Sequence, residues 1–177
     1  MSELDQRIVL APTDGSLGPL LRIADDRLSP KAGYGRHEHR AVDVVAVVLA
    51  GELRHRWTGG ARLRAGDVAV LRAGTGLAHD EIAGDDGARV LQAYLRSADP
   101  GRPPTHEVVP RATGWIDLGR PDARLWIGRG DDDPPPGLRL VADADRTAVL
   151  EELSVPRAPG LVIVWQLDAG RPAWAAE

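Results

Sequence analysis

The stretch GYGRHEHR, at residues 33–40, places two of the chain's five histidines one residue apart, between glycines and charged side chains. In a β-strand, residues i and i+2 point to the same face of the sheet. His37 and His39 are therefore expected to direct two imidazole rings into one space. Gly33 and Gly35 allow the backbone to bend beside them. We expect a short, bent strand that presents a pair of imidazoles.

A second stretch, GTGLAHDE at residues 74–81, repeats this arrangement later in the chain. His79 and Glu81 again share one face of a strand, and Gly74 and Gly76 allow the positive φ angles of a tight turn before them. Three neutral imidazoles and one carboxylate can converge on one divalent cation, and this donor set suits Fe, Mn, Ni, Cu, Co or Zn. The two stretches together therefore predict one metal site.

Runs rich in valine and leucine recur between glycines and prolines, at a spacing of roughly 8–12 residues that is typical of an all-β sandwich or barrel. VDVVAVVLAG at residues 42–51 is continuously apolar, so it predicts a strand that is buried on both faces and ends at Gly51. ELRHRW at residues 52–57 alternates, which predicts a half-buried strand with His55 on its inner face. Two short strands are expected within residues 61–74, and single strands at residues 77–83, 88–96, 122–130, 138–144, 147–153 and 161–167.

Other segments are expected to connect these strands. GDDG at residues 84–87 predicts a hairpin turn. The segment at residues 97–114 is rich in proline and is expected to be a linker, with His106 as a solvated loop residue. The sequence DADRTAVLEEL leaves an alternative open, because a short helix could begin near Asp145 instead of a strand.

The composition excludes several classes of function. The net charge of −4 argues against a dedicated nucleic-acid-binding surface. The chain has no cysteine, which excludes disulfides and thiolate metal ligands. The N-terminal residues are too polar for a signal peptide, and no apolar run approaches the length of a membrane span. We therefore expect a soluble, cytoplasmic protein that binds neither nucleic acid nor membrane directly.

Three longer stretches of the sequence carry a family resemblance. They follow one another in the order of the two cupin motifs and read LRIADDRLSPKAGYGRHEHR, VVLAGELRH and LRAGTGLAHDE. From residue 18 to about residue 105 the chain resembles the pirin family of the cupin superfamily, which includes quercetin 2,3-dioxygenase-like proteins. The resemblance implies a cupin β-barrel, also called a double-stranded β-helix, that holds one divalent metal ion. Fe(II) is the first choice, with Mn, Ni, Cu, Co or Zn as alternatives. The ligands that the resemblance implies are His37, His39, His79 and Glu81.

The expected organisation is a metal-binding cupin barrel over residues 1–105, a linker over residues 106–114 and a truncated second cupin-like β unit over residues 115–177. The second unit is shorter than a full cupin barrel and contains no histidine, so it cannot repeat the metal site. The acidic residue after the first motif is Asp43, where pirins usually have glutamate.

Three further residues are candidates for the surroundings of the metal. His55 could orient a metal ligand, or could be a hydrogen-bonded core histidine. Asp43 could accept a hydrogen bond from a ligand imidazole, or could have only a structural role. Gln92 could line the pocket, or could pack as a half-buried strand residue.

The resemblance implies a metal-dependent dioxygenase that cleaves a flavonol-like or other enolisable aromatic substrate, with Glu81 as the base toward a substrate hydroxyl. Two alternatives stay open: a non-enzymatic, metal-dependent protein for redox sensing or regulation, and a biosynthetic cupin isomerase or cyclase. The expected partner is a small aromatic or enolate-like molecule. A homodimer is a further option, because a shortened second unit would expose a strand edge or an apolar face.

Overall fold

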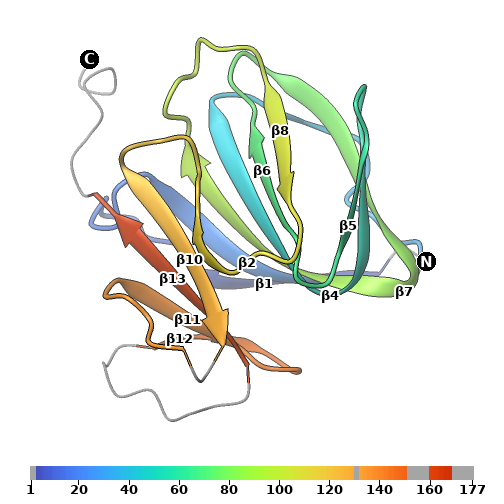
Figure 1. The fold of residues 1–177 in the computed structure, drawn as a ribbon. Coiled ribbons are helices and arrows are strands. Elements are labelled where there is room, and N and C mark those ends of the chain that lie inside the picture. Colours follow the sequence, from blue (N-terminus) through green and yellow to red (C-terminus); the bar gives the residue numbers. More distant parts are fainter. Residues whose placement is uncertain (1–2, 130–131, 151–159, 169–177) are drawn as a thin grey trace.

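The computed structural model describes residues 3–129, 132–150 and 160–168. These residues form two antiparallel sheets and no helix, which confirms the predicted all-β class (Figure 1). The first sheet has eight strands in the order β1-β2-β7-β4-β6-β8, with β3 paired to β7 and β5 paired to β4. Its strands are β1 (Leu4–Leu10), β2 (Leu20–Leu28), β3 (His37–His39), β4 (Val42–Arg56), β5 (Ala61–Arg64), β6 (Val68–Arg72), β7 (Leu77–Arg96) and β8 (Thr105–Val109).

The second sheet has five strands in the order β12-β11-β13-β10-β9. Its strands are β9 (Gly114–Ile116), β10 (Ala123–Arg129), β11 (Leu138–Ala142), β12 (Thr147–Leu150) and β13 (Leu161–Leu167). For the segment DADRTAVLEEL, the sequence allowed either a strand or a short helix. Residues 147–150 of this segment form a strand, and residues 151–153 lie outside the described part of the chain. In the described part of the chain there is no helix long and apolar enough to cross a membrane.

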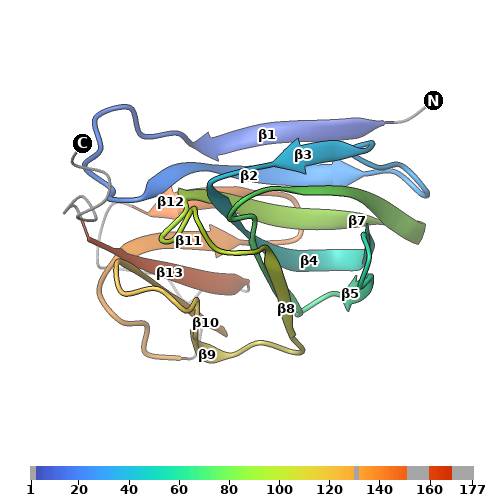
Figure 2. The ribbon, with the colours of Figure 1, turned by 90° about the horizontal axis from the view of Figure 1, so that it is seen from above.

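Alternate side chains of β4 enter two different cores, because neighbouring strand residues point to opposite faces. Val45 and Val47 pack between the two sheets, whereas Ala46 and Val48 pack inside the curl of the first sheet. All four side chains are buried, so the prediction of a strand buried on both faces is confirmed. Figure 2 shows how β1, β2, β7 and β4 follow one another across the first sheet.

Strands β4 and β7 are both longer than predicted. β4 continues beyond Gly51, and β7 runs through residues 84–87, where the sequence predicted a hairpin turn. Between the pairs Gly51↔Ala88 and Leu53↔Ala83, a single residue of β4 faces residues 84–87 of β7. The predicted turn is therefore wrong: GDDG forms a bulge, because β4 pairs with β7 on both sides of it.

A second irregularity, in β4 itself, changes which of its residues face inward: Val48 pairs with Val90 but Ala50 pairs with Arg89, so β4 has one extra residue there. Before it, Val48 points into the curl of the first sheet, and after it, Leu53 does so. Alternation from Leu53 places His55 on the same inner face, where it is 3% exposed. The irregular pairing thus turns His55 toward β7.

The predicted linker over residues 106–114 is wrong in its first part. Residues Thr105–Val109 form β8, which pairs with β6 so that His106 lies opposite Leu71. The prolines flank this edge strand at positions 103–104 and 110 and do not interrupt it. His106 is accordingly a half-buried strand residue, and its expected place in a solvated loop is wrong.

The second sheet shares its core with the first. Ile116, Leu125 and Trp165 of the second sheet belong to the same apolar cluster as Ile23 and Val45 of the first. Two buried ion pairs also lie in this region, and one of them joins Arg120 to Asp43 of β4. The second β unit therefore stabilises the first one directly and positions the outer face of β4.

Candidate metal centre

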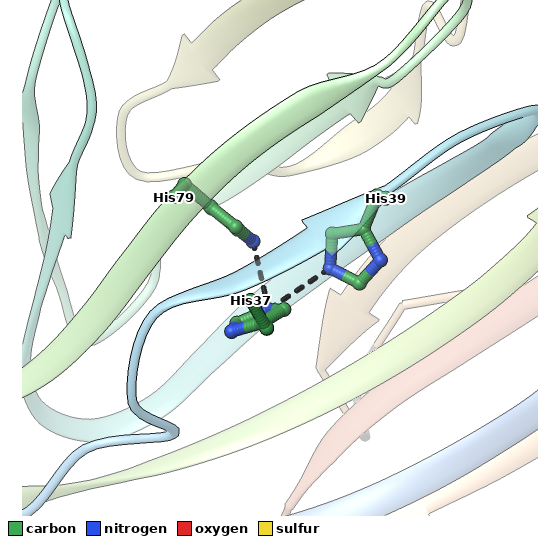
Figure 3. Close-up of side chains that lie close together, drawn as sticks. All are labelled: His37, His39 and His79. Carbon is green, nitrogen blue, oxygen red and sulfur yellow. Dashed lines mark hydrogen bonds between the residues drawn. The ribbon is translucent and has the colours of Figure 1, made fainter.

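The register of β3 and β7 brings three histidines together. His37 lies directly opposite His79 in the antiparallel pair, and His39 lies two residues further on the same face of β3. Residues directly opposite each other on neighbouring strands have Cβ atoms about 5 Å apart, so their side chains meet. Figure 3 shows the three imidazole rings pointing toward one another.

Two glycines shape the backbone that leads into β3. Gly33 pairs with Ile82 of β7, and a Cβ atom at Gly33 would lie 2.5 Å from the carbonyl oxygen of Glu81, which excludes any larger residue. Gly35 has a φ of 73°, and its carbonyl oxygen lies 2.7 Å from Nδ1 of His37. The backbone therefore fixes the orientation of the His37 ring before any metal binds.

The three ring nitrogens are closely spaced. Nε2 of His37 lies 2.9 Å from Nε2 of His79 and 3.0 Å from Nε2 of His39. Since Nδ1 of His37 donates its hydrogen to the carbonyl oxygen of Gly35, Nε2 of the neutral ring carries only a lone pair. One lone pair cannot accept well-formed hydrogen bonds from both neighbours, so hydrogen bonding does not account for the cluster.

The spacing fits a shared cation. Two nitrogens that each bind one ion at about 2.1 Å, at right angles, are about 3.0 Å apart. The donor atoms of His37, His39 and His79 all lie within 4.8 Å of one another. His37 and His39 are half-buried and His79 is buried, so solvent reaches the cluster from the side of β3. These residues suit a divalent metal ion held by three imidazoles.

Burial keeps the rings of His79 and His39 neutral. It lowers the pKa of His79 to about 4, against a smaller opposing effect of the Glu81 carboxylate. Burial also lowers the pKa of His39, with a contribution from the neighbouring His37. A neutral imidazole has the free lone pair that a metal ion requires, so His79 and His39 are in the binding form at pH 7.

In the metal-free protein, we expect the rings of His79 and His106 to stay neutral at pH 6, where a histidine with the ordinary pKa of 6.5 is mostly protonated. Burial disfavours the imidazolium form, and it lowers the pKa of each ring to about 4. NMR titration of the imidazole C–H resonances measures both values. Protons then compete little for the His79 lone pair at pH 6. A His79 midpoint near 6.5 would contradict the prediction.

Glu81, the fourth predicted ligand, lies outside the three-histidine group. The register places it opposite His55, and Nε2 of His55 lies 2.7 Å from its Oε1 atom. Nε2 of Gln92 donates to both carboxylate oxygens, at 3.3 and 3.2 Å. Burial would raise the pKa of Glu81, but the contacts with His55, His79 and Gln92 lower it to about 2. The carboxylate is therefore ionised beside the cluster, and its role as a metal ligand stays a prediction.

The other predicted neighbours of the metal lie in different places. His55 and Gln92 both contact Glu81, so each belongs to the immediate surroundings of the cluster. Asp43 does not: its Oδ2 atom accepts a hydrogen bond from Nη1 of Arg120 at 2.7 Å. Of the two roles left open for Asp43, the structure shows the structural one, because Asp43 shares the face of β4 that carries Val45 and faces the second sheet.

Sequence reasoning missed several polar residues around the cluster. Arg22 and Asp26 lie on the inner face of β2, and the hydroxyl of Tyr34 donates to Oδ2 of Asp26 at 2.7 Å. The guanidinium of Arg22 stacks 4.2 Å from the ring centroid of Tyr94. Arg22 and Asp26 are four residues apart and therefore share one face of a strand, which was the available signal. His106 could have been found from the run of strand-forming residues between its flanking prolines.

Comparison with known proteins identifies a family that this chain resembles in sequence. Residues 12–95 match the family model described as pirin. Two curated relatives carry the name "Putative quercetin 2,3-dioxygenase": one from Zymomonas mobilis is 34% identical over 84 residues, and one from Pseudomonas aeruginosa is 29% identical over 129 residues. The alignments cover 46% and 71% of this chain but only 36% and 53% of the relatives. The chain thus matches roughly a third to a half of their length.

Solved structures share the fold at low identity. Bacterial pirin YhhW from Escherichia coli, in complex with nickel(II), superimposes with a TM-score of 0.70 at 18% identity, covering 93% of this chain and 92% of that chain. Quercetin 2,3-dioxygenase from Acinetobacter baumannii superimposes with a TM-score of 0.59 at 17% identity, covering 91% of this chain and 75% of that chain. The predicted cupin fold with a smaller second β unit is confirmed.

Proposed function

This chain belongs to the pirin family of cupins through residues 12–95, and on that premise we propose that it is a metal-dependent dioxygenase that acts on a flavonol-like or other enolisable aromatic substrate. The observation that carries the proposal is the convergence of three imidazole nitrogens at 2.9 and 3.0 Å. The names of the relatives support this reaction class over the alternatives of sensing and isomerisation.

His37, His39 and His79 would hold the metal ion, with Fe(II) as the first choice and Ni(II) as the first alternative. The ion would polarise a substrate oxygen as a Lewis acid and, if redox-active, supply the reactivity toward O₂. Since two of the three histidines are half-buried, the cluster is open to solvent on the side of β3, which favours an enzyme. A sealed cluster would have favoured a sensor.

The surrounding side chains suit a planar, anionic molecule. Glu81 is ionised and can take the proton from a substrate hydroxyl at its carboxylate. Gln92 holds that carboxylate in place by donating to both of its oxygens. Arg22 places a positive charge over the ring of Tyr94, whose centroid lies 5.7 Å from that of His39. This charge would stabilise the enolate that Glu81 leaves behind.

We expect the protein to consume quercetin and release CO once it carries a suitable metal. The test is anaerobic purification and metal analysis, reconstitution with Fe(II), Mn(II), Ni(II) or Cu(II), and an oxygen-dependent assay. Glu81→Gln should lower the turnover number by about 100-fold or more, because the amide cannot accept the proton. Turnover by none of the metal-loaded forms, with the metal bound, would refute the dioxygenase and favour a binding protein.

A further inference from the structure

A second pair of histidines lies behind the metal cluster, on the side away from β3. Nδ1 of His55 lies 2.7 Å from Nε2 of His106, and their ring centroids are 4.8 Å apart. His55 comes from β4 and His106 from β8, two strands that each pair with β6. The ring of Trp57 lies 5.3 Å from that of His106. The pair is thus enclosed by the first sheet and joined to Glu81 through His55.

The distances determine where the hydrogens are. Nε2 of His55 and Oε1 of Glu81 are 2.7 Å apart, although the N–H does not point squarely at the oxygen. Two lone pairs at that distance would repel, so His55 carries a hydrogen on Nε2. When the His55 ring is neutral, its Nδ1 then has only a lone pair. In that state the hydrogen in the short contact with His106 belongs to Nε2 of His106.

We propose that His106 is a positioning residue of the metal site: its Nε2–H donates to Nδ1 of His55, and His55 in turn donates from Nε2 to the carboxylate of Glu81. This relay runs in one direction, from β8 through β4 to β7. It holds His55 in a single tautomer and holds Glu81 ionised on the same strand face as His79. The inference rests on the proposed function, because it assigns the relay to the metal site.

The relay provides hydrogen-bond partners for polar groups that are buried beside the metal site. A buried carboxylate is costly unless it accepts hydrogen bonds, and a buried imidazole nitrogen is costly without a donor. Gln92 satisfies one side of Glu81, and the two histidines satisfy the other. Outer partners of this kind set the orientation of groups at a metal, and their loss commonly weakens metal binding by about 10- to 100-fold.

The direction of the relay is tested without any metal. Long-range ¹H–¹⁵N NMR spectra of the metal-free wild-type protein at pH 7 distinguish the two imidazole tautomers. We expect both His106 and His55 to carry hydrogen on Nε2 and none on Nδ1 of His55. A His106 ring with an unprotonated Nε2 would overturn the proposal, because His106 would then accept the hydrogen bond.

The coupling to the metal site is tested with Ni(II) as the probe, in competition with a chelator. His106→Phe keeps a ring but removes the donor, and its dissociation constant for Ni(II) should rise about 10- to 100-fold. His106→Gln should restore tight binding, because its side-chain amide can donate from the position of Nε2. Glu107→Gln, on the exposed face of the same strand, is the matched control and should bind Ni(II) like the wild type.

The outcomes separate the relay from the proposed function. If His106→Phe binds Ni(II) as tightly as the wild type, or if His106→Gln fails to recover while remaining folded, the positioning role is overturned. If the wild type binds no Ni(II), Fe(II), Mn(II) or Cu(II), the proposed function fails. The NMR experiment would then still decide the direction of the hydrogen bonds.

Discussion

Replacing His79 by alanine is expected to abolish stoichiometric uptake of metal by this protein. His79 is the only fully buried member of the three-histidine cluster, and it lies directly opposite His37 in the β3–β7 ladder. Alanine removes one of three donors and leaves His37 and His39 as a partly solvated pair. The loss should exceed the roughly 10- to 100-fold weakening that follows removal of an outer hydrogen-bond partner.

The measurement is elemental analysis after reconstitution with Ni(II) and dialysis against a weak chelator. Glu38→Gln is a matched control, because Glu38 lies between His37 and His39 on β3 and its side chain is exposed on the opposite face. The control should retain the metal content of the wild type. Full metal content in His79→Ala would show that the ligands are assigned to the wrong residues.

The second large effect is expected from Arg120→Met, which should lower the free energy of unfolding by about 3–5 kcal/mol. Nη1 of Arg120 lies 2.7 Å from Oδ2 of Asp43, and their side chains are 2% and 5% exposed. Arg120 also makes paired hydrogen bonds to Asp122 at 2.7 and 3.0 Å. Methionine fills a similar volume but leaves two carboxylates without their cation, and one of them is deeply buried.

Urea denaturation measures this change. Arg102→Met removes an ion pair with Asp99 whose side chains are 79% and 52% exposed, so it should change the stability by at most about 1 kcal/mol. Both variants should unfold in one transition, because the two sheets share a core. If Arg120→Met is as stable as Arg102→Met, the ion pair does not hold the second sheet against β4. A second transition would show that the sheets unfold separately.

Local patterns in the sequence were sufficient for part of the site. The spacing of His37 and His39 determined that the two rings share a face, because a strand repeats every two residues. The unbroken apolar run in β4 was likewise enough to predict burial on both faces, and its alternate residues do enter two cores. Gly35, two residues before His37, supplies the carbonyl oxygen that orients the His37 ring. Each of these features depends on residues that are close together in the chain.

The remaining features arise from contacts between distant segments. The bulge at residues 84–87 exists because β4 pairs with β7 on both sides of it, and it brings His55 opposite Glu81. Asp43 turns away from the three-histidine cluster because Arg120, from the connection between β9 and β10, is there to pair with it. His106 becomes part of the site only through the pairing of β8 with β6. Strand periodicity is a property of neighbouring residues, whereas register and sheet packing depend on how the whole chain buries its apolar surface, and no short stretch contains that information.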